Sequence, residues 1–205
     1  MRKVLWCMLL VTVLVACNQE DVEETRENTI RNAQMDAREE NLLRAAAGET
    51  LFIYDVSVDE RGGELEVWLE KYEYGQLSDE KIGGMRTGIF DAGQILFTVR
   101  EILDTPNALV RMVIVSESGS DSTESLIELP TISRYGKSSL LEDVTPLTDN
   151  MAIGQIIYSE EESLIIKSSW GEIGNDPTAI ATELKDKPVV YLVRCSFKEG
   201  SAKVE

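Results

Sequence analysis

The chain has 205 residues, with 37 acidic and 20 basic side chains and a formal net charge of −17. Hydrophobic residues make up 43% and charged residues 28%, a balance typical of globular proteins and too apolar for a disordered one. The acid excess argues against nucleic acid binding, and the absence of histidine removes the commonest general base and the commonest zinc ligand.

Residues 1–17 have the features of a secretory signal. A basic start, Arg2 and Lys3, precedes an apolar stretch over residues 4–15 that only one threonine interrupts. This length suits the hydrophobic part of a signal peptide, and it is too short to span a bilayer as a stable helix. The alternative is an uncleaved membrane anchor.

The apolar stretch ends in Leu14, Val15, Ala16 and Cys17, which resembles the lipobox of bacterial lipoproteins. The resemblance implies that Cys17 receives diacylglycerol through a thioether and that a dedicated peptidase cuts before it. The mature protein would then be held by its lipid at the extracytoplasmic face of the cell membrane. Two acyl chains are enough for stable anchoring. We expect no cofactor besides this covalent lipid.

The chain divides into a signal peptide over residues 1–16, a lipid-anchored acidic tether over residues 17–49 and a folded domain over residues 50–205. Removing the signal peptide takes away two bases and no acid, so the formal charge moves from −17 to −19. Beyond the lipobox we find no motif that identifies a family.

The second half of the tether is rich in good helix formers, which predicts a short helix near Ala37–Ala47 with Gly48 after its end. A flexible segment that ends in this helix would hold the domain clear of the lipid head groups. The alternative is that Leu42 and Leu43 pack the helix onto the domain.

From Leu51 onward, apolar residues recur at every second position, which is the period of β-strands. Turn-like connections separate these segments and no long helical pattern lies between them, so we predict a mainly β, antiparallel sandwich or barrel-like domain. The predicted strands are residues 51–58, 64–72, 94–101, 108–116, 124–129, 152–158, 163–170 and 189–197.

The connections carry further predictions. We expect the Ser-rich residues 116–123 to form a hairpin loop and the glycines within residues 83–88 to form turns. The longest irregular connection, residues 131–150, is predicted to cross between sheets. Residues 176–187 predict a short helix, with Asp176 as its N-cap.

Cys195 is the only cysteine left to the domain, because Cys7 is removed with the signal and Cys17 carries lipid. An internal disulfide is therefore excluded. Cys195 alternates with apolar residues of its strand, which indicates a core thiol, and no histidine exists to activate it as a nucleophile.

One predicted strand offers a candidate ligand face. Leu65, Val67 and Leu69 alternate as core residues, which places Trp68, Tyr72 and Tyr74 on the other side among glutamates. Exposed aromatic rings of this kind stack on sugars or hold a basic peptide. The alternative is that Trp68 packs under a loop or the tether and that the tyrosines bridge core and solvent.

Acidic turns at Asp59–Glu60 and Glu160–Glu162 offer oxygen ligands for calcium, but they lack the spacing of an EF-hand and are more typical of solvated turns. We assign no catalytic, cofactor-binding or metal-binding residue. The expected function is a non-catalytic binding role, with a protein or an envelope glycan as partner and no nucleic acid. The alternatives are a carboxylate-dependent hydrolase of cell-envelope glycans and an accessory subunit of a membrane complex.

Overall fold

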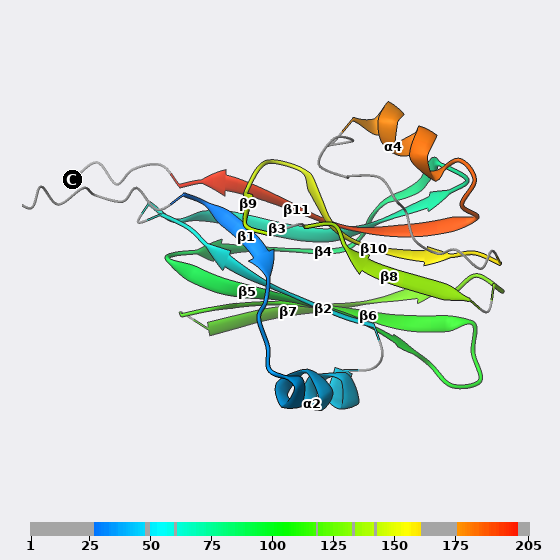
Figure 1. Ribbon diagram of the computed structural model, residues 1–205, viewed down its shortest axis with the longest axis horizontal. Coiled ribbons are helices and arrows are strands. Elements are labelled where there is room, and N and C mark those ends of the chain that lie inside the picture. Colours follow the sequence, from blue (N-terminus) through cyan, green and yellow to red (C-terminus); the bar gives the residue numbers. More distant parts are fainter. Residues whose placement is uncertain are drawn as a thin grey trace, which may run out of the picture.

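Two antiparallel sheets face each other and enclose the core (Figure 1). The computed structural model describes residues 27–47, 50–59, 61–117, 119–132, 134–141, 143–160 and 176–200. The six-stranded sheet has the order β7-β6-β5-β2-β1-β9, and the five-stranded sheet has the order β4-β3-β11-β10-β8. The prediction of a mainly β sandwich is confirmed, and the strands form two sheets rather than a closed barrel.

The elements follow one another as β1 Thr29–Asn32, α2 Ala37–Ala47, β2 Thr50–Ser57, β3 Gly63–Glu73, β4 Gln76–Ile89, β5 Ala92–Glu101, β6 Asn107–Ser116, β7 Gly119–Glu128, β8 Tyr135–Ser139, β9 Thr145–Pro146, β10 Met151–Tyr158, α4 Pro177–Leu184 and β11 Val189–Glu199. The chain changes sheet between β2 and β3, between β4 and β5, between β7 and β8, and on both sides of β9.

The core fills the space between the two inner faces, as the alternation of apolar residues predicts. Leu65, Val67 and Leu69 of β3 are fully buried there, which confirms the predicted orientation of this strand. From β11 the core receives all five residues that alternate with the predicted core thiol: Val189, Tyr191, Val193, Cys195 and Phe197.

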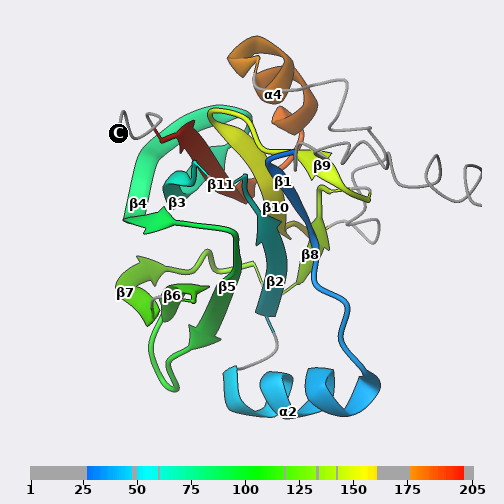
Figure 2. The same cartoon turned by 90° about the vertical axis from the view of Figure 1, so that its left-hand side faces the viewer.

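Helix α4 lies on the outer face of the five-stranded sheet (Figure 2). Asp176 accepts a hydrogen bond from the Thr178 amide at 2.9 Å and Pro177 begins the helix, so the predicted N-cap is confirmed. Ile180 and Leu184 pack against outward-facing residues of the sheet to form a second, smaller core. Its sheet residues are Tyr72, Ile157, Val190 and Leu192.

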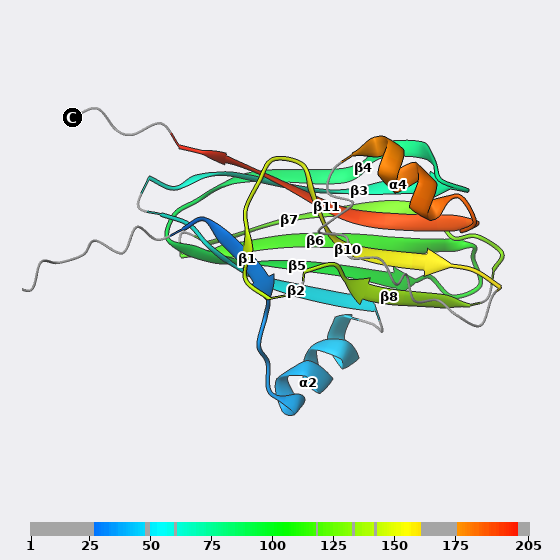
Figure 3. The same cartoon turned by 45° about the horizontal axis from the view of Figure 1, so that its top comes forward.

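Helix α2 lies on the other side of the sandwich, near β2 and β5 (Figures 2 and 3). Its bounds confirm the helix predicted near Ala37–Ala47, while Gly48 lies outside the described residues. Asp36 caps the helix by accepting hydrogen bonds from the amides of Arg38 and Glu39. None of its residues is buried, and Leu42 points into solvent. Among the described residues, neither helix has the length and apolarity needed to span a bilayer.

The boundary of the folded domain needs correction. Residues 29–32 lie within the expected tether of residues 17–49, yet they form β1, which pairs with β2 and β9. Ile30 is fully buried in the main core. A four-residue strand with a single buried side chain has no recognisable two-residue period, and the polar residues around it give the segment the composition of a tether.

Two expected turns are also wrong. Within the loop expected over residues 116–123, Gly119 to Thr123 belong to the edge strand β7, because pairing with the apolar strand β6 overrides their turn-like composition. Gly83 and Gly84 lie inside β4, where both have positive φ angles of 68° and 116° near a shift in the pairing with β3. They form a bulge that bends this long strand rather than ending it.

The connection over residues 131–150 crosses between the sheets, as predicted, but it is not wholly irregular. It contributes β8 to the five-stranded sheet and β9 to the six-stranded sheet before β10 returns to the former. The predicted strand over residues 163–170 lies outside the described residues.

Strand register defines two ends of the sandwich. At the first end, Thr29 of β1 is opposite Ser57 of β2, and Gly63 of β3 is opposite Glu199 of β11. Figure 1 shows both ends of the described chain emerging on this side, at the left. We call it the terminal end. The far end carries the tips of the β3–β4 and β5–β6 hairpins.

Gly154 of β10 provides a test of the packing between the sheets. A Cβ atom there would lie 2.6 Å from the Tyr54 hydroxyl, which donates a hydrogen bond to the Ile153 carbonyl at 2.8 Å. We expect Gly154→Ala to lower the free energy of unfolding by about 1–3 kcal/mol through overpacking. Urea unfolding followed by circular dichroism measures this loss.

Gly88→Ala serves as the matched control for Gly154→Ala. Its added Cβ meets only the Phe90 ring, at an ordinary 3.8 Å, so stability should stay near wild type. Tyr54→Phe removes the hydroxyl, so the double variant with Gly154→Ala should lose less than the sum of the two single losses. Strict additivity would show that the hydroxyl does not limit the space at Gly154.

Candidate functional site

The predicted site residues fall in three different environments. Cys17 lies outside the described residues. Trp68 and Tyr72 lie on the outer side of β3 with exposed fractions of 8% and 6%, whereas Tyr74, just beyond the strand, is 64% exposed. The three side chains therefore do not form one exposed aromatic stripe. Burial of Trp68 agrees with the alternative in which this ring packs under a cover.

The buried side chains Trp68 and Tyr72 converge on Glu70, which lies between them on β3. The Trp68 indole nitrogen donates to Glu70 Oε1 at 3.2 Å, and the Tyr72 hydroxyl donates to Glu70 Oε2 at 2.9 Å. Burial raises the pKa of Tyr72, and the negative charge of Glu70 raises it further. The Tyr72 hydroxyl therefore stays protonated and keeps donating to the carboxylate.

Arg194 brings a positive charge to this carboxylate from the neighbouring strand. It is opposite Trp68 in the pairing of β11 with β3, is 2% exposed, and places its Nε atom 3.5 Å from Glu70 Oε2. Its Nη2 atom donates to the carbonyl and side-chain oxygens of Asn150 at 2.9 and 2.7 Å. Its Nε and Nη1 atoms have no hydrogen-bond acceptor, so the guanidinium is only partly satisfied.

Sequence reasoning missed the Glu70–Arg194 pair. It placed Glu70 on the outer side of its strand, and alternation with the core residue Cys195 puts Arg194 on the outer side of β11. Only the register between β3 and β11 brings the two charges together, and register is set by tertiary pairing.

Next to this cluster, two basic side chains of β4 cover the outer face of β3. The Lys81 ammonium lies 5.2 Å from the centre of the Trp68 ring and forms an ion pair with Glu66. Arg86 binds the other Glu66 oxygen at 3.0 Å. Burial alone would raise the pKa of Glu66, but the hydrogen bonds from Lys81 and Arg86 outweigh it and hold that pKa below its usual value.

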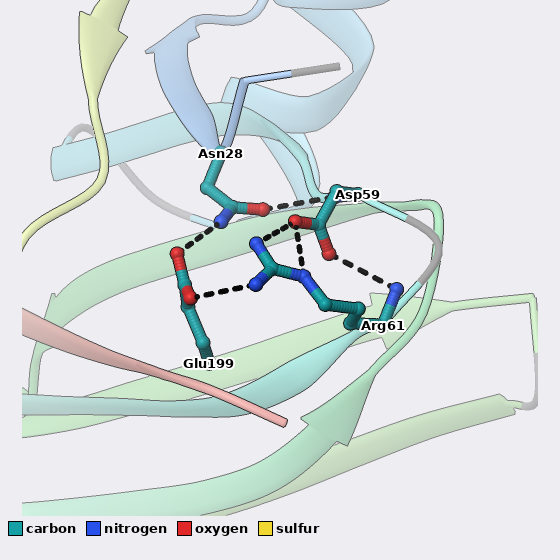
Figure 4. Close-up of polar contacts among 4 residues, drawn as sticks. All are labelled: Asn28, Asp59, Arg61 and Glu199. Atoms are coloured by element: carbon teal, nitrogen blue, oxygen red, sulfur yellow. Dashed lines mark hydrogen bonds and ion pairs between the residues drawn. The ribbon is translucent and has the colours of Figure 1, made fainter. Parts of the chain in front are cut away.

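A second polar cluster, which we call the terminal clamp, consists of Asn28, Asp59, Arg61 and Glu199 (Figure 4). The Asn28 side chain donates to Glu199 Oε1 at 3.2 Å and accepts from the Asp59 amide at 2.8 Å. Arg61 donates to Asp59 through Nε at 2.9 Å and pairs with Glu199 through Nη1 at 3.3 Å. The clamp thus joins the start of β1, the turn between β2 and β3, and the end of β11.

Electrostatics in the terminal clamp favour ionised carboxylates. The hydrogen bond from the Arg61 side chain is the largest influence on Asp59 and lowers its pKa below the usual range. The calcium hypothesis placed Asp59 beside Glu60, which lies outside the described residues, as do Glu161 and Glu162. The described part of the chain holds no group of three or more acidic or cysteine side chains arranged for a metal ion.

Cys195 lies on the core side of the sheet, opposite in orientation to its neighbour Arg194. Burial raises the pKa of its thiol to about 12, although the nearby arginine charge opposes this slightly. A neutral, buried thiol is neither nucleophile nor metal ligand, which agrees with the structural role predicted for Cys195.

Comparison with known proteins identifies a family. The family model described as the YgaN domain matches residues 29–197, which is most of the chain and begins at the first residue of β1. No curated protein and no solved structure matches the chain significantly. The match extends over a region in which the sequence alone showed no family motif.

The buried ion pair makes Glu70→Gln a strong test of the cluster. Removing the carboxylate charge leaves the Arg194 charge buried without compensation, and we expect the free energy of unfolding to fall by about 3–5 kcal/mol. Glu64→Gln, which breaks an exposed pair with Arg86, should cost at most about 1 kcal/mol. Adding Arg194→Met to Glu70→Gln should restore part of the loss. Equal, small losses in both single variants would contradict this role of Glu70.

The clamp predicts a pH dependence of stability. Because the folded state lowers the pKa of Asp59, its contribution is present above the unfolded pKa of about 4 and is lost as pH falls through the folded value. Asp59→Asn should therefore flatten the loss of stability below about pH 4 in unfolding experiments. Glu117→Gln removes the same charge from an exposed residue and should keep the wild-type acid dependence. Identical profiles for Asp59→Asn and wild type would exclude the proposed contribution.

Proposed function

We propose that this chain, which belongs to the YgaN domain family, is a lipoprotein anchored at the extracytoplasmic face of the cell membrane with a non-catalytic binding role. The observation that carries the proposal is the position of β1. Its first residue, Thr29, follows the lipobox cysteine Cys17 by only twelve positions, and the strand is built into the sheet at the terminal end. The anchor and the domain are thereby closely joined.

The terminal clamp supports this arrangement mechanically. An anchored domain is held through its first strand, and β1 is short, with only Ile30 deeply buried. Asn28 precedes β1 and is bonded both to the β2–β3 turn and to the end of β11. A force applied through the anchor is therefore distributed over the β2–β3 turn and the end of β11 as well as the β1 hydrogen bonds.

The electrostatics favour binding over hydrolysis of envelope glycans. A carboxylate-dependent hydrolase needs one acid whose pKa is raised, so that it can protonate the leaving group. Asp59 and Glu66 are shifted in the opposite direction by their basic partners. The most buried acid of the described residues, Glu70, is only 6% exposed and accepts hydrogen bonds from Trp68 and Tyr72, so it is enclosed rather than open to a substrate.

A specific observation also favours a role as accessory subunit of a membrane complex. Among the described residues, several large apolar side chains are exposed at the far end, away from the predicted anchor. They belong to hairpin tips, where no folding requirement explains them. Exposed apolar side chains on such tips are available for contact with another protein.

The test of the anchor is Cys17→Ser in cells of the bacterium that makes the protein. We expect it to abolish labelling with an alkyne-tagged palmitate and to leave unprocessed precursor or released protein, since serine has no thiol to form the thioether. A Cys195→Ser variant is the matched control and should keep both lipid label and processing. Unchanged membrane retention and processing of Cys17→Ser would contradict the lipid anchor.

A further inference from the structure

The far end of the sandwich presents three exposed apolar side chains on two hairpin tips. Tyr74 follows β3 with a positive φ of 49°, and Ile102 and Leu103 follow β5. Leu103 is 89% exposed, the highest value among the large exposed hydrophobic residues of the described chain. A tip residue does not contribute to strand pairing, so Leu103 gains nothing from folding that a polar residue would lack.

Acidic side chains accompany these tips. Burial and then the charges of Glu73, Glu128 and Asp79 raise the pKa of Tyr191 to about 12, so these three carboxylates act on the same hydroxyl. The main chain of Glu128 lies beside this hydroxyl, because its carbonyl accepts a hydrogen bond from Tyr191 at 3.1 Å. Glu101 acts in the same way on Tyr158, which contacts Tyr191 edge-to-face.

The acids of the two ends differ in their partners. At and near the terminal end, Asp59 and Glu199 pair with Arg61, and Glu66 pairs with Lys81 and Arg86. At the far end Glu73 pairs with Lys71. Within the described part of the chain, no ion pair involves Asp79, Glu101 or Glu128, three further acids of this end. Their charge remains available to a partner.

Basic residues also occur at this end, at Arg100, Arg134, Lys185 and Lys187. In the described part of the chain, Arg100, Arg134 and Lys185 form no ion pair with Asp79, Glu101 or Glu128. We call the combination of Tyr74, Ile102, Leu103, Asp79, Glu101 and Glu128 the hairpin-tip surface. It combines apolar anchors with carboxylates, which matches a partner that is apolar and basic.

Chain length limits where such a partner can be. Twelve positions between Cys17 and Thr29 span at most about 40 Å when fully extended. The eleven residues of β3 add about 35 Å along the sandwich. The hairpin-tip surface of an anchored molecule therefore stays within about 75 Å of the bilayer, a distance within reach of the extracytoplasmic parts of membrane proteins.

We infer that the hairpin-tip surface docks a basic, apolar segment in the extracytoplasmic part of a membrane-held protein. The limit on reach rests on the lipid anchor proposed above, whereas the chemistry of the surface does not. Leu103 and Tyr74 enter apolar recesses of the partner, and Glu101, Glu128 and Asp79 pair with its Lys or Arg side chains. Association is therefore weakened by salt.

The test is photo-crosslinking in intact cells of the full chain that carries benzoylphenylalanine at one position. We expect position 74 or 103 to give a specific adduct with a membrane-held protein. The crosslinked segment of that protein should carry a net positive charge. Positions 90 and 144, where Phe90 and Val144 are also exposed but near the terminal end, should give at least fivefold less of this adduct. Equal adducts from all four positions, or none from 74 and 103, would overturn the inference.

Charge variants in the position-74 background test the electrostatic part. Glu101→Gln with Glu128→Gln should reduce the adduct several-fold. Glu27→Gln with Glu117→Gln makes the same change in net charge at residues near the terminal end and should leave it within twofold. Docking by charge would be contradicted if the first pair of substitutions left the adduct yield unchanged, or if the crosslinked segment of the partner were acidic.

Failure of the anchor and failure of the docking surface give different results. If Cys17→Ser shows that the chain is not lipidated, only the limit on reach is lost, and the position dependence of crosslinking still decides the docking surface. If lipidation is confirmed while crosslinking favours positions 90 and 144, the anchor stands and the hairpin-tip surface is excluded as the docking site.

Discussion

Strand β11 is buried on both sides, and most features of the molecule depend on this constraint. It lies between β3 and β10, with apolar residues such as Val193 in the main core and Leu192 under α4. Because its outer side is also shielded from water, the charged residue Arg194 on that side requires a partner. Glu70 on β3 provides it, and Trp68 and Tyr72 are then drawn into the same network as donors.

The same sandwich has two ends of different character. At the terminal end, carboxylates are held by arginine and lysine side chains, and the clamp uses them to join segments that are far apart in sequence. At the far end, Glu73 pairs with Lys71, whereas Asp79, Glu101 and Glu128 lie near the Tyr158–Tyr191 pair and form no ion pair within the described part of the chain; apolar side chains occupy the hairpin tips. Charge that stabilises the fold is thus largely separated from charge that remains exposed to solvent.

Alternation of apolar residues was sufficient to predict the sandwich, the inward side of β3 and the burial of Cys195, because these follow from local period alone. It could not predict β1, whose only buried residue is Ile30, or β7, whose strand structure comes from pairing with β6. The aromatic face was predicted in orientation but not in exposure. Whether Trp68 is open to a ligand depends on what covers the outer side of the sheet, and one strand's sequence holds no information on that.

If Cys17 carries the proposed lipid, the short connection between it and the fold determines which faces of the domain another protein can reach. With a tether to residue 49, the domain would have moved freely above the membrane, and any exposed face would have served equally well. With β1 beginning at residue 29 and its start bound to β11 through Asn28 and Glu199, an anchored molecule keeps its terminal end near the bilayer. The faces beside the terminal end are then crowded by the membrane, and the far end is the part most accessible to another protein. The location of the apolar tips at that end is consistent with this geometry.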